Sequence, residues 1–170
     1  DLVKILLENG ADINNEPLHN AAYSNSLDVA KFLIENGADV NNKNILGETP
    51  LHFAAKNNSA DAAKILIENG ADINHRDKNG MTTLFMTLFG CDSEFPTSDL
   101  VKFLIENGAD VNKATVHGAT PINLAAAGNR SDLVKILLEN GADINNEPLH
   151  NAAYSNSLDV AKFLIENGAD

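Results

Sequence analysis

One short stretch recurs six times along the chain and limits what the chain can fold into. It reads LIENGADVN at residues 33–41, and variants of it end at Asn14, Asn74, Asn112, Asn145 and, cut short, Asp170. Each copy joins the end of an apolar segment to a glycine and a short extended run. Complete copies follow one another at intervals of 27 to 38 residues. This pattern predicts a repeat array, in which each unit contacts only its neighbours.

The segment before each glycine has the pattern of a helix packed between two neighbours. At residues 1–9 the charged side chains of Asp1, Lys4 and Glu8 fall on one narrow stripe, and most other positions are apolar. Gly10 follows, at a place where a left-handed residue ends a helix and glycine adopts that conformation at least cost. The same trio and glycine recur in each copy, so we expect this helix in every repeat.

A second signature predicts a shorter helix ahead of this one. Residues 49–52 read Thr-Pro-Leu-His, in which the threonine can cap a helix and the proline presets its first turn. Ala54 and Ala55 allow the helix to lie close to its neighbours. The polar residues 57–59 then form a loop to the next helix. Each repeat is therefore expected to be a helix–loop–helix unit.

The acidity of the chain belongs to the repeat and not to a binding site. The formal net charge is −12; each of six copies supplies −1 from its Asp/Lys/Glu trio and −1 from the Asp of its GAD turn, and the other charges cancel. Broad nucleic-acid binding needs a dense basic face, so we expect no nucleic-acid partner. No apolar run approaches the roughly 20 residues that span a bilayer. We expect no membrane insertion and an intracellular, cytoplasmic location.

Together the two signatures resemble those of the ankyrin-repeat family, and the resemblance covers the whole chain. It rests on the six NGAD turns and on ETPLHFAA at 48–55, ATPINLAA at 119–126 and EPLHNAA at 16–22 and 147–153. The resemblance implies an all-α solenoid of stacked helix-loop-helix units with β-hairpin fingers. It also implies a non-catalytic protein that binds partner proteins through its finger tips and first helices, on the concave side.

The repeat boundaries follow from these signatures. We expect a single domain over residues 1–170, with the second half of a repeat at 1–14 and repeats at 15–41, 42–74, 75–112, 113–145 and 146–170. The spacing is irregular at two kinds of place. Five extra residues fall within 90–98, which we expect to be a surface loop. Only two residues precede Pro17 and Pro148 after the preceding repeat's Asn, so we expect no finger there.

Residues 1–39 are identical to residues 132–170. The identity indicates a recent duplication within a longer array, deliberate engineering, or an artefact of sequence assembly. Neither end carries the polar capping repeat that stacked arrays use for solubility. We therefore expect a fragment of a longer array, with end-to-end self-association through its uncapped repeats.

No residue pattern predicts chemistry. His19, His52 and His150 share one place in the first-helix signature, and we interpret them as bracing one repeat against the next because no second metal ligand lies at suitable spacing. No local constellation of a histidine and an acid around Cys91 indicates a nucleophile, and Cys91 is interpreted as a surface thiol. A phosphate-binding loop, a nucleotide fingerprint and paired catalytic carboxylates are all missing from the sequence. We expect no enzyme, no cofactor and no metal.

The finger tips carry the best candidates for partner binding. Ile45, Leu46, Met81 and Val116 are apolar where water-exposed tips are normally polar, which favours a protein contact. The opposing interpretation is that single exposed apolar residues have no function. The full candidate set adds the neighbouring tip residues and the ends of the first helices: Ile45, Leu46, Glu48, Lys78, Asn79, Met81, Val116 and His117, with Tyr23, Lys56 and Phe89.

Two further functions stay open on the sequence alone. Recurrence of a whole cassette favours a structural spacer, in which the length of the array matters and no particular surface does. The array could also be the regulatory or targeting portion of a larger polypeptide.

Overall fold

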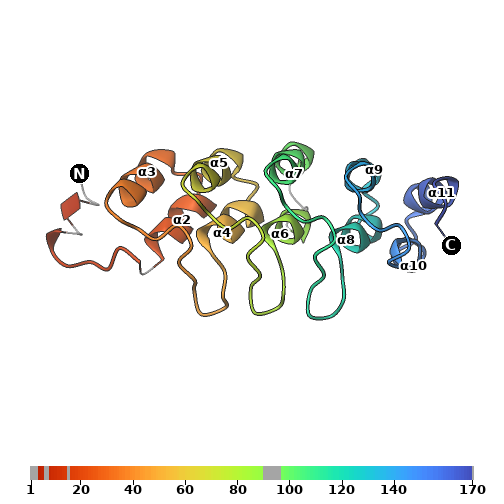
Figure 1. Ribbon diagram of the computed structural model, residues 1–170, viewed down its shortest axis with the longest axis horizontal. Coiled ribbons are helices and arrows are strands. Elements are labelled where there is room, and N and C mark those ends of the chain that lie inside the picture. Colours follow the sequence, from red (N-terminus) through yellow and green to blue (C-terminus); the bar gives the residue numbers. More distant parts are fainter. Residues whose placement is uncertain (1–3, 6–7, 15, 90–96, 170) are drawn as a thin grey trace.

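The chain folds into a row of stacked helix pairs. The computed structural model describes residues 4–5, 8–14, 16–89 and 97–169. Within them, five pairs follow in chain order: α2 (Pro17–Tyr23) with α3 (Leu27–Glu35), α4 (Pro50–Lys56) with α5 (Ala60–Glu68), α6 (Thr83–Phe89) with α7 (Thr97–Glu106), α8 (Pro121–Ala127) with α9 (Ser131–Glu139), and α10 (Pro148–Tyr154) with α11 (Leu158–Glu166). The first helices form one row and the second helices another (Figure 1). The predicted all-α solenoid is confirmed.

The helix ends follow the predicted signals. Gly37, after α3, has φ of +91°, and the glycines at the same place in the other repeats are also left-handed. The preceding Asn36 donates from Nδ2 to the carbonyl of Phe32 over 2.8 Å and so satisfies one of the last free carbonyls of the helix. At the start of α4, Thr49 is extended, as an N-cap residue should be, and Pro50 opens the first turn.

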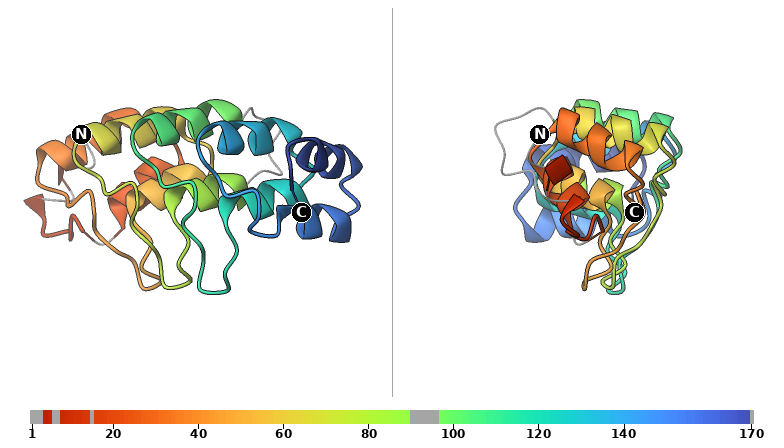
Figure 2. Two further views of the ribbon diagram at one scale, coloured as in Figure 1. Left: turned by 45° about the vertical axis from the view of Figure 1, so that its right-hand side comes forward. Right: turned by 90° about the vertical axis from the view of Figure 1, so that its left-hand side faces the viewer.

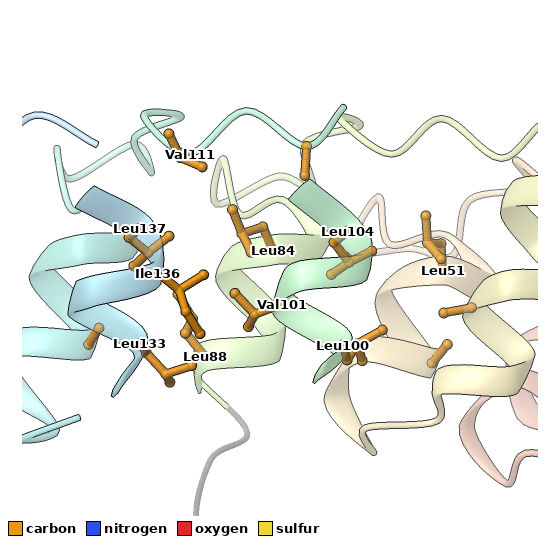
Figure 3. Close-up of a cluster of buried hydrophobic side chains, with 14 of the residues drawn as sticks. Leu51, Leu84, Leu88, Leu100, Val101, Leu104, Val111, Leu133, Ile136 and Leu137 are labelled. Carbon is orange, nitrogen blue, oxygen red and sulfur yellow. The ribbon is translucent and has the colours of Figure 1, made fainter. Parts of the chain in front are cut away.

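The core is a continuous strip of leucine and alanine between the two rows of helices. Leu33, Leu66 and Leu104 on successive second helices are fully buried. On the first helices, alanines such as Ala54 lie against the neighbouring pair, where a larger side chain would push the helices apart. Figure 3 shows this strip passing from Leu51 through Leu84 to the cluster around Leu137.

A ladder of asparagines links the turns of neighbouring repeats. Asn41 donates from Nδ2 to the carbonyl of Gly70 over 3.0 Å, and its Oδ1 accepts the N–H of Asp72 over 2.8 Å. Asn74 and Asn112 make the same two bonds to the turns that follow them. The invariant end of the GAD(I/V)N run therefore joins one repeat to the next.

Three long loops project from the row of first helices, between α3 and α4, α5 and α6, and α7 and α8 (Figure 2). They are hairpin-shaped fingers, but none of their described residues is β-strand. The connection from α9 to α10 is short, as the sequence spacing predicts. The residue before the first proline of the helix differs between the two kinds of connection. Glu147, which ends the short connection before α10, has a left-handed φ of 59°, whereas Thr49, which ends the longer connection before α4, is extended.

Part of the sequence interpretation lies outside the described residues. This applies to residues 90–96, including Cys91, which make up most of the predicted surface loop, and to parts of the helix expected at residues 1–9. Thr97 and Ser98, assigned to that loop from the sequence, form the first turn of α7.

Candidate functional site

Each finger is built around a polar side chain that holds its own turn. In the first finger, Oδ1 of Asn44 accepts the N–H groups of Leu46 and Glu48 over 2.9 and 3.0 Å. In the second, Oδ1 of Asp77 accepts those of Asn79 and Met81, each over 2.8 Å. A side-chain oxygen that satisfies two backbone donors fixes the turn in each of these two fingers, and in the third Oγ1 of Thr115 accepts the N–H of Ala119 over 3.2 Å.

The three fingers are also bonded to one another. The N–H of Lys78 donates to the carbonyl of Leu46 over 3.0 Å, and the N–H of Val116 donates to the carbonyl of Asn79 over 2.9 Å. Arg76 strengthens the second contact by donating to the carbonyl of Ala114 over 2.7 Å. The tips therefore form one row of fixed spacing.

This row presents apolar side chains to solvent. Ile45 is 82% exposed and Val116 is 59% exposed, and Leu46 is also exposed. The neighbouring tip residues Lys78, Asn79 and His117 are exposed, whereas Met81 is half-buried. Exposed large aliphatic groups on a rigid frame are typical of a protein contact, because their burial needs little ordering of the surface that carries them.

A second group of candidates gathers on α2 and α4. Lys56, at the end of α4, reaches back to Oε1 of Glu48 over 2.6 Å and lies 4.9 Å from the ring centre of Phe53. The ring of Tyr23 meets the same Phe53 edge to face at 6.5 Å. These contacts make a small mixed aromatic and cationic surface beside the base of the first finger.

Glu48 itself is a supporting group in this arrangement. Its side chain is buried, although the sequence placed it among the exposed tip residues. Burial alone would raise the pKa of this carboxyl, but hydrogen bonds from Lys56 and Asn44 outweigh that effect and hold the pKa below its ordinary value. The carboxylate therefore stays ionised and orients Lys56.

Phe89 lies apart from both groups. It is exposed at the end of α6 and borders a hollow of about 330 Å³, whose walls include Leu88, Leu124 and Leu133. Among the described residues, no contact joins it to the finger row.

The hollow beside the third finger is different in character: it measures about 170 Å³ and is lined by polar groups of His117, Asn123, Asn146 and Glu147, next to the short connection.

Two of the three signature histidines, His19 and His52, brace neighbouring repeats as predicted. Nδ1 of His52 accepts the N–H of Thr49 over 3.3 Å, so the ring proton is on Nε2, which donates to the carbonyl of Met81 over 3.1 Å. Burial lowers the pKa of His52 below its ordinary value, and the ring stays neutral. His19 makes the equivalent bond to the carbonyl of Glu48. His150, at the same place in α10, is exposed.

Within the part of the chain that the structure describes, no cluster of three or more His, Cys, Asp or Glu side chains could hold a metal ion. The helices in that part are also too short or too polar for any of them to cross a membrane.

Phe53 and Arg76 also belong to this surface, although neither is among the candidates predicted from the sequence. Phe53 joins Tyr23 to Lys56, and Arg76 crosses from the second finger to the third. Variation between repeats was an available signal for Phe53. Its place in the first helix is filled by Asn20, Met86 and Leu124 elsewhere, while the alanines that follow it are nearly constant.

Stacked helix pairs with projecting fingers and bonded turns define a helical repeat solenoid. The family model for ankyrin repeats (3 copies) matches residues 1–77, 18–113 and 90–170, which together span the chain. The chain belongs to the ankyrin-repeat family. A search of curated proteins finds no match. Ankyrin repeats are in general protein–protein interaction modules and are typically non-catalytic scaffolds.

Proposed function

We propose that this chain is a non-catalytic scaffold that binds a partner protein through its finger face. The finger face consists of the tip residues Ile45, Leu46, Lys78, Asn79, Met81, Val116 and His117, together with Tyr23 and with Lys56, which Glu48 orients. Phe89 lies apart from this face and is not counted in it. The observation that carries the proposal is the row of exposed aliphatic tips fixed by backbone hydrogen bonds.

The chemistry of this face suggests the kind of partner. Aliphatic tips favour a partner that offers apolar side chains. Lys78 is exposed at the second tip, so an acidic group beside those apolar side chains would be attracted there, whereas the charge of Lys56 is already paired with Glu48. The preferred partner is an apolar protein segment flanked by acidic residues.

The experiment pans a displayed peptide library against the immobilised chain and measures the affinity of the enriched peptides for two variants. The first variant carries Ile45→Asp and Leu46→Asp. Full burial of one aliphatic side chain is worth about 1.5–3 kcal/mol, so we expect the affinity to fall about tenfold or more. Far-UV circular dichroism should be unchanged, because both side chains are exposed and the row is held by the backbone.

The control variant carries Lys64→Ala and Lys102→Ala. These lysines are exposed on the second helices, and their loss changes the net charge by the same two units. The control should keep its affinity for the peptides. Equal losses in both variants, or no loss in the first, would show that the finger face is not the binding surface.

A structural spacer is the second candidate function, and the identity of residues 1–39 with 132–170 favours it. A spacer needs repeated stacking and no particular surface chemistry. Panning would then enrich no peptide that depends on Ile45 and Leu46. The two ends of the stack are a separate candidate contact, with another copy of the same chain.

A further inference from the structure

The row of fingers stops before α10 because the connection to this helix is short. Loops project ahead of α4, α6 and α8, whereas none projects between α9 and α10 (Figure 1). Eight residues lie between Asn74 and Thr83, but only two lie between Asn145 and Pro148. The polar hollow of about 170 Å³ lies beside this shortened connection, between residues 117–119 of the third finger and the connection and first turn of α10. We call this hollow the slot.

One wall of the slot offers the main-chain acceptor that joins one finger to the next. The carbonyl of Leu46 accepts the N–H of Lys78 over 3.0 Å. In the same way, the carbonyl of Asn79 accepts the N–H of Val116 over 2.9 Å. His117 holds the equivalent place in the third finger, and no group of the described residues donates to its carbonyl. The slot therefore presents an acceptor where a fourth finger would form its bond.

The opposite wall is held in place by two asparagines. Asn123 donates from Nδ2 to the carbonyl of Asn146 over 2.5 Å. Asn151 donates from Nδ2 to the carbonyl of Glu147 over 2.8 Å. Where His52 replaces Asn123 in another repeat, the longer side chain reaches a finger of full length instead. The short connection is thus fixed by side chains that suit it, and a slot with fixed walls binds a ligand at a lower cost in ordering.

The fingers themselves show what kind of group fits the slot. Each tip is a four-residue turn, closed by a hydrogen bond from the N–H of its glycine to the carbonyl three residues earlier, at Gly47, Gly80 and Gly118. The turn leaves the N–H of its second residue unused, and Lys78 and Val116 donate this group to the neighbouring finger. A β-turn on the surface of another protein has the same unused N–H.

The charge of the slot favours a basic turn. Its walls contain one carboxylate, that of Glu147, and no lysine or arginine. Glu147 is exposed, and the ion pairs of the described residues do not include it. The chain as a whole has a net charge of −12. A lysine or arginine beside the bound turn would be attracted by both charges, whereas an acidic turn would be repelled.

We propose that the slot binds a basic β-turn of a partner protein, which takes the place of the missing finger. The N–H of the second residue of the turn donates to the carbonyl of His117, and a lysine or arginine next to the turn pairs with Glu147. The slot adjoins the finger face at His117 but uses none of the aliphatic tips. It is a separate site and does not rest on the function proposed above.

The test titrates the complete 170-residue chain with a cyclic peptide and follows the amide signals of the chain by NMR. The peptide has the sequence of residues 75–82, closed head to tail. This segment forms the second finger, and it carries Arg76 and Lys78 beside its turn. We expect saturable shifts at the backbone amide of Gly118 and at the side-chain amide of Asn151, with the second helices unaffected.

Two altered peptides separate the two parts of the recognition. A methyl group on the backbone nitrogen of Lys78 removes the donor and keeps every side chain, so we expect the affinity to fall about fivefold. Replacing Arg76 and Lys78 of the peptide by glutamate should abolish binding. An equal affinity for the methylated peptide would show that the carbonyl of His117 is not the acceptor and would overturn the proposal.

Matched variants of the chain locate the charge. Glu147→Gln should lower the affinity for the unmodified peptide about threefold. Glu106→Gln removes one carboxylate from an exposed place on α7 and should leave the affinity unchanged. The variant with Ile45→Asp and Leu46→Asp should also keep its affinity, which distinguishes the slot from the finger face. An equal loss in the Glu147 and Glu106 variants would mean that only the net charge attracts the peptide, contrary to the proposal.

A last variant fills the slot from within. It carries residues 75–82 in place of Asn146 and Glu147, which gives this repeat a finger of full length. The new finger should occupy the slot and abolish peptide binding, so binding that persists would contradict the proposal, as would the absence of saturable shifts in the unaltered chain. Shifts at Gly118 that grow with chain concentration in the absence of peptide would identify a second copy as the occupant and would also overturn it.

Discussion

Replacing Asn41 by alanine tests whether the asparagine ladder couples neighbouring repeats. The substitution removes two hydrogen bonds to the next turn, the one to the carbonyl of Gly70 over 3.0 Å and the one from the N–H of Asp72 over 2.8 Å. A net contribution of about 0.5–1.5 kcal/mol for each bond gives a loss of about 1–3 kcal/mol. The turn is partly open to water, which can replace a lost partner, so we expect about 1–2 kcal/mol.

Urea unfolding followed by far-UV circular dichroism measures this loss as a shift of the transition midpoint. Because the two bonds join separate repeats, their loss should also broaden the unfolding transition. The slope of the free energy of unfolding against urea concentration should therefore fall. A loss of stability at constant slope would mean that Asn41 acts within its own turn only.

Asn36→Ala is the matched control, since it changes the same residue type five positions earlier. Asn36 makes one side-chain bond, to Phe32 in its own helix, and it is exposed. We expect a loss below about 1 kcal/mol with an unchanged slope. If Asn41→Ala proves no more destabilising than Asn36→Ala, the asparagine ladder does not couple the repeats.

Two further predictions concern the histidine brace and the finger contact. The folded-state pKa of His52 lies below that of the unfolded chain, so the unfolded chain binds the proton first, and stability should fall as the pH drops through about 6.5. His52→Asn copies the arrangement at Asn123, which bonds Thr120 without titrating near neutral pH, and it should reduce this fall in urea midpoint between pH 7.5 and 5.5; an unchanged fall would contradict the role of His52. Gly80→Ala should destabilise more than Gly118→Ala, because both residues have positive φ but an added Cβ would lie 2.9 Å from the backbone nitrogen of Val116 only at Gly80. Equal urea midpoints for these two variants would argue against a tight contact between the fingers.

The helices, their ends and the short connection could be predicted from the sequence because each depends on local signals. A glycine directly after an amphipathic segment, such as Gly37, ends a helix, and a proline directly after a threonine, such as Pro50, begins one. Two residues before Pro148 cannot form a long finger, whatever surrounds them. Repetition of these signals reduced the chance that any one of them was misleading.

The candidate surface could be predicted only in outline. The exposure of Ile45 and Val116 follows from their place at finger tips, but the burial of Glu48 depends on a lysine eight residues further along that folds back onto it. The role of Arg76 depends on the distance between the second and third fingers. That distance is set by how the repeats stack, and it cannot be read from the sequence. Interactions that cross from one element to another therefore needed the structure.

The bonds between fingers join main-chain atoms, the carbonyl of Leu46 with the N–H of Lys78 and the carbonyl of Asn79 with the N–H of Val116. A peptide group is nearly the same whatever side chain it carries, so mutation can exchange the side chains at the tips without moving the row. An array of this kind can acquire new binding preferences one tip at a time, with every intermediate still folded. A library randomised at positions 45, 46, 78 and 116 would vary the chemistry of the surface on a constant frame.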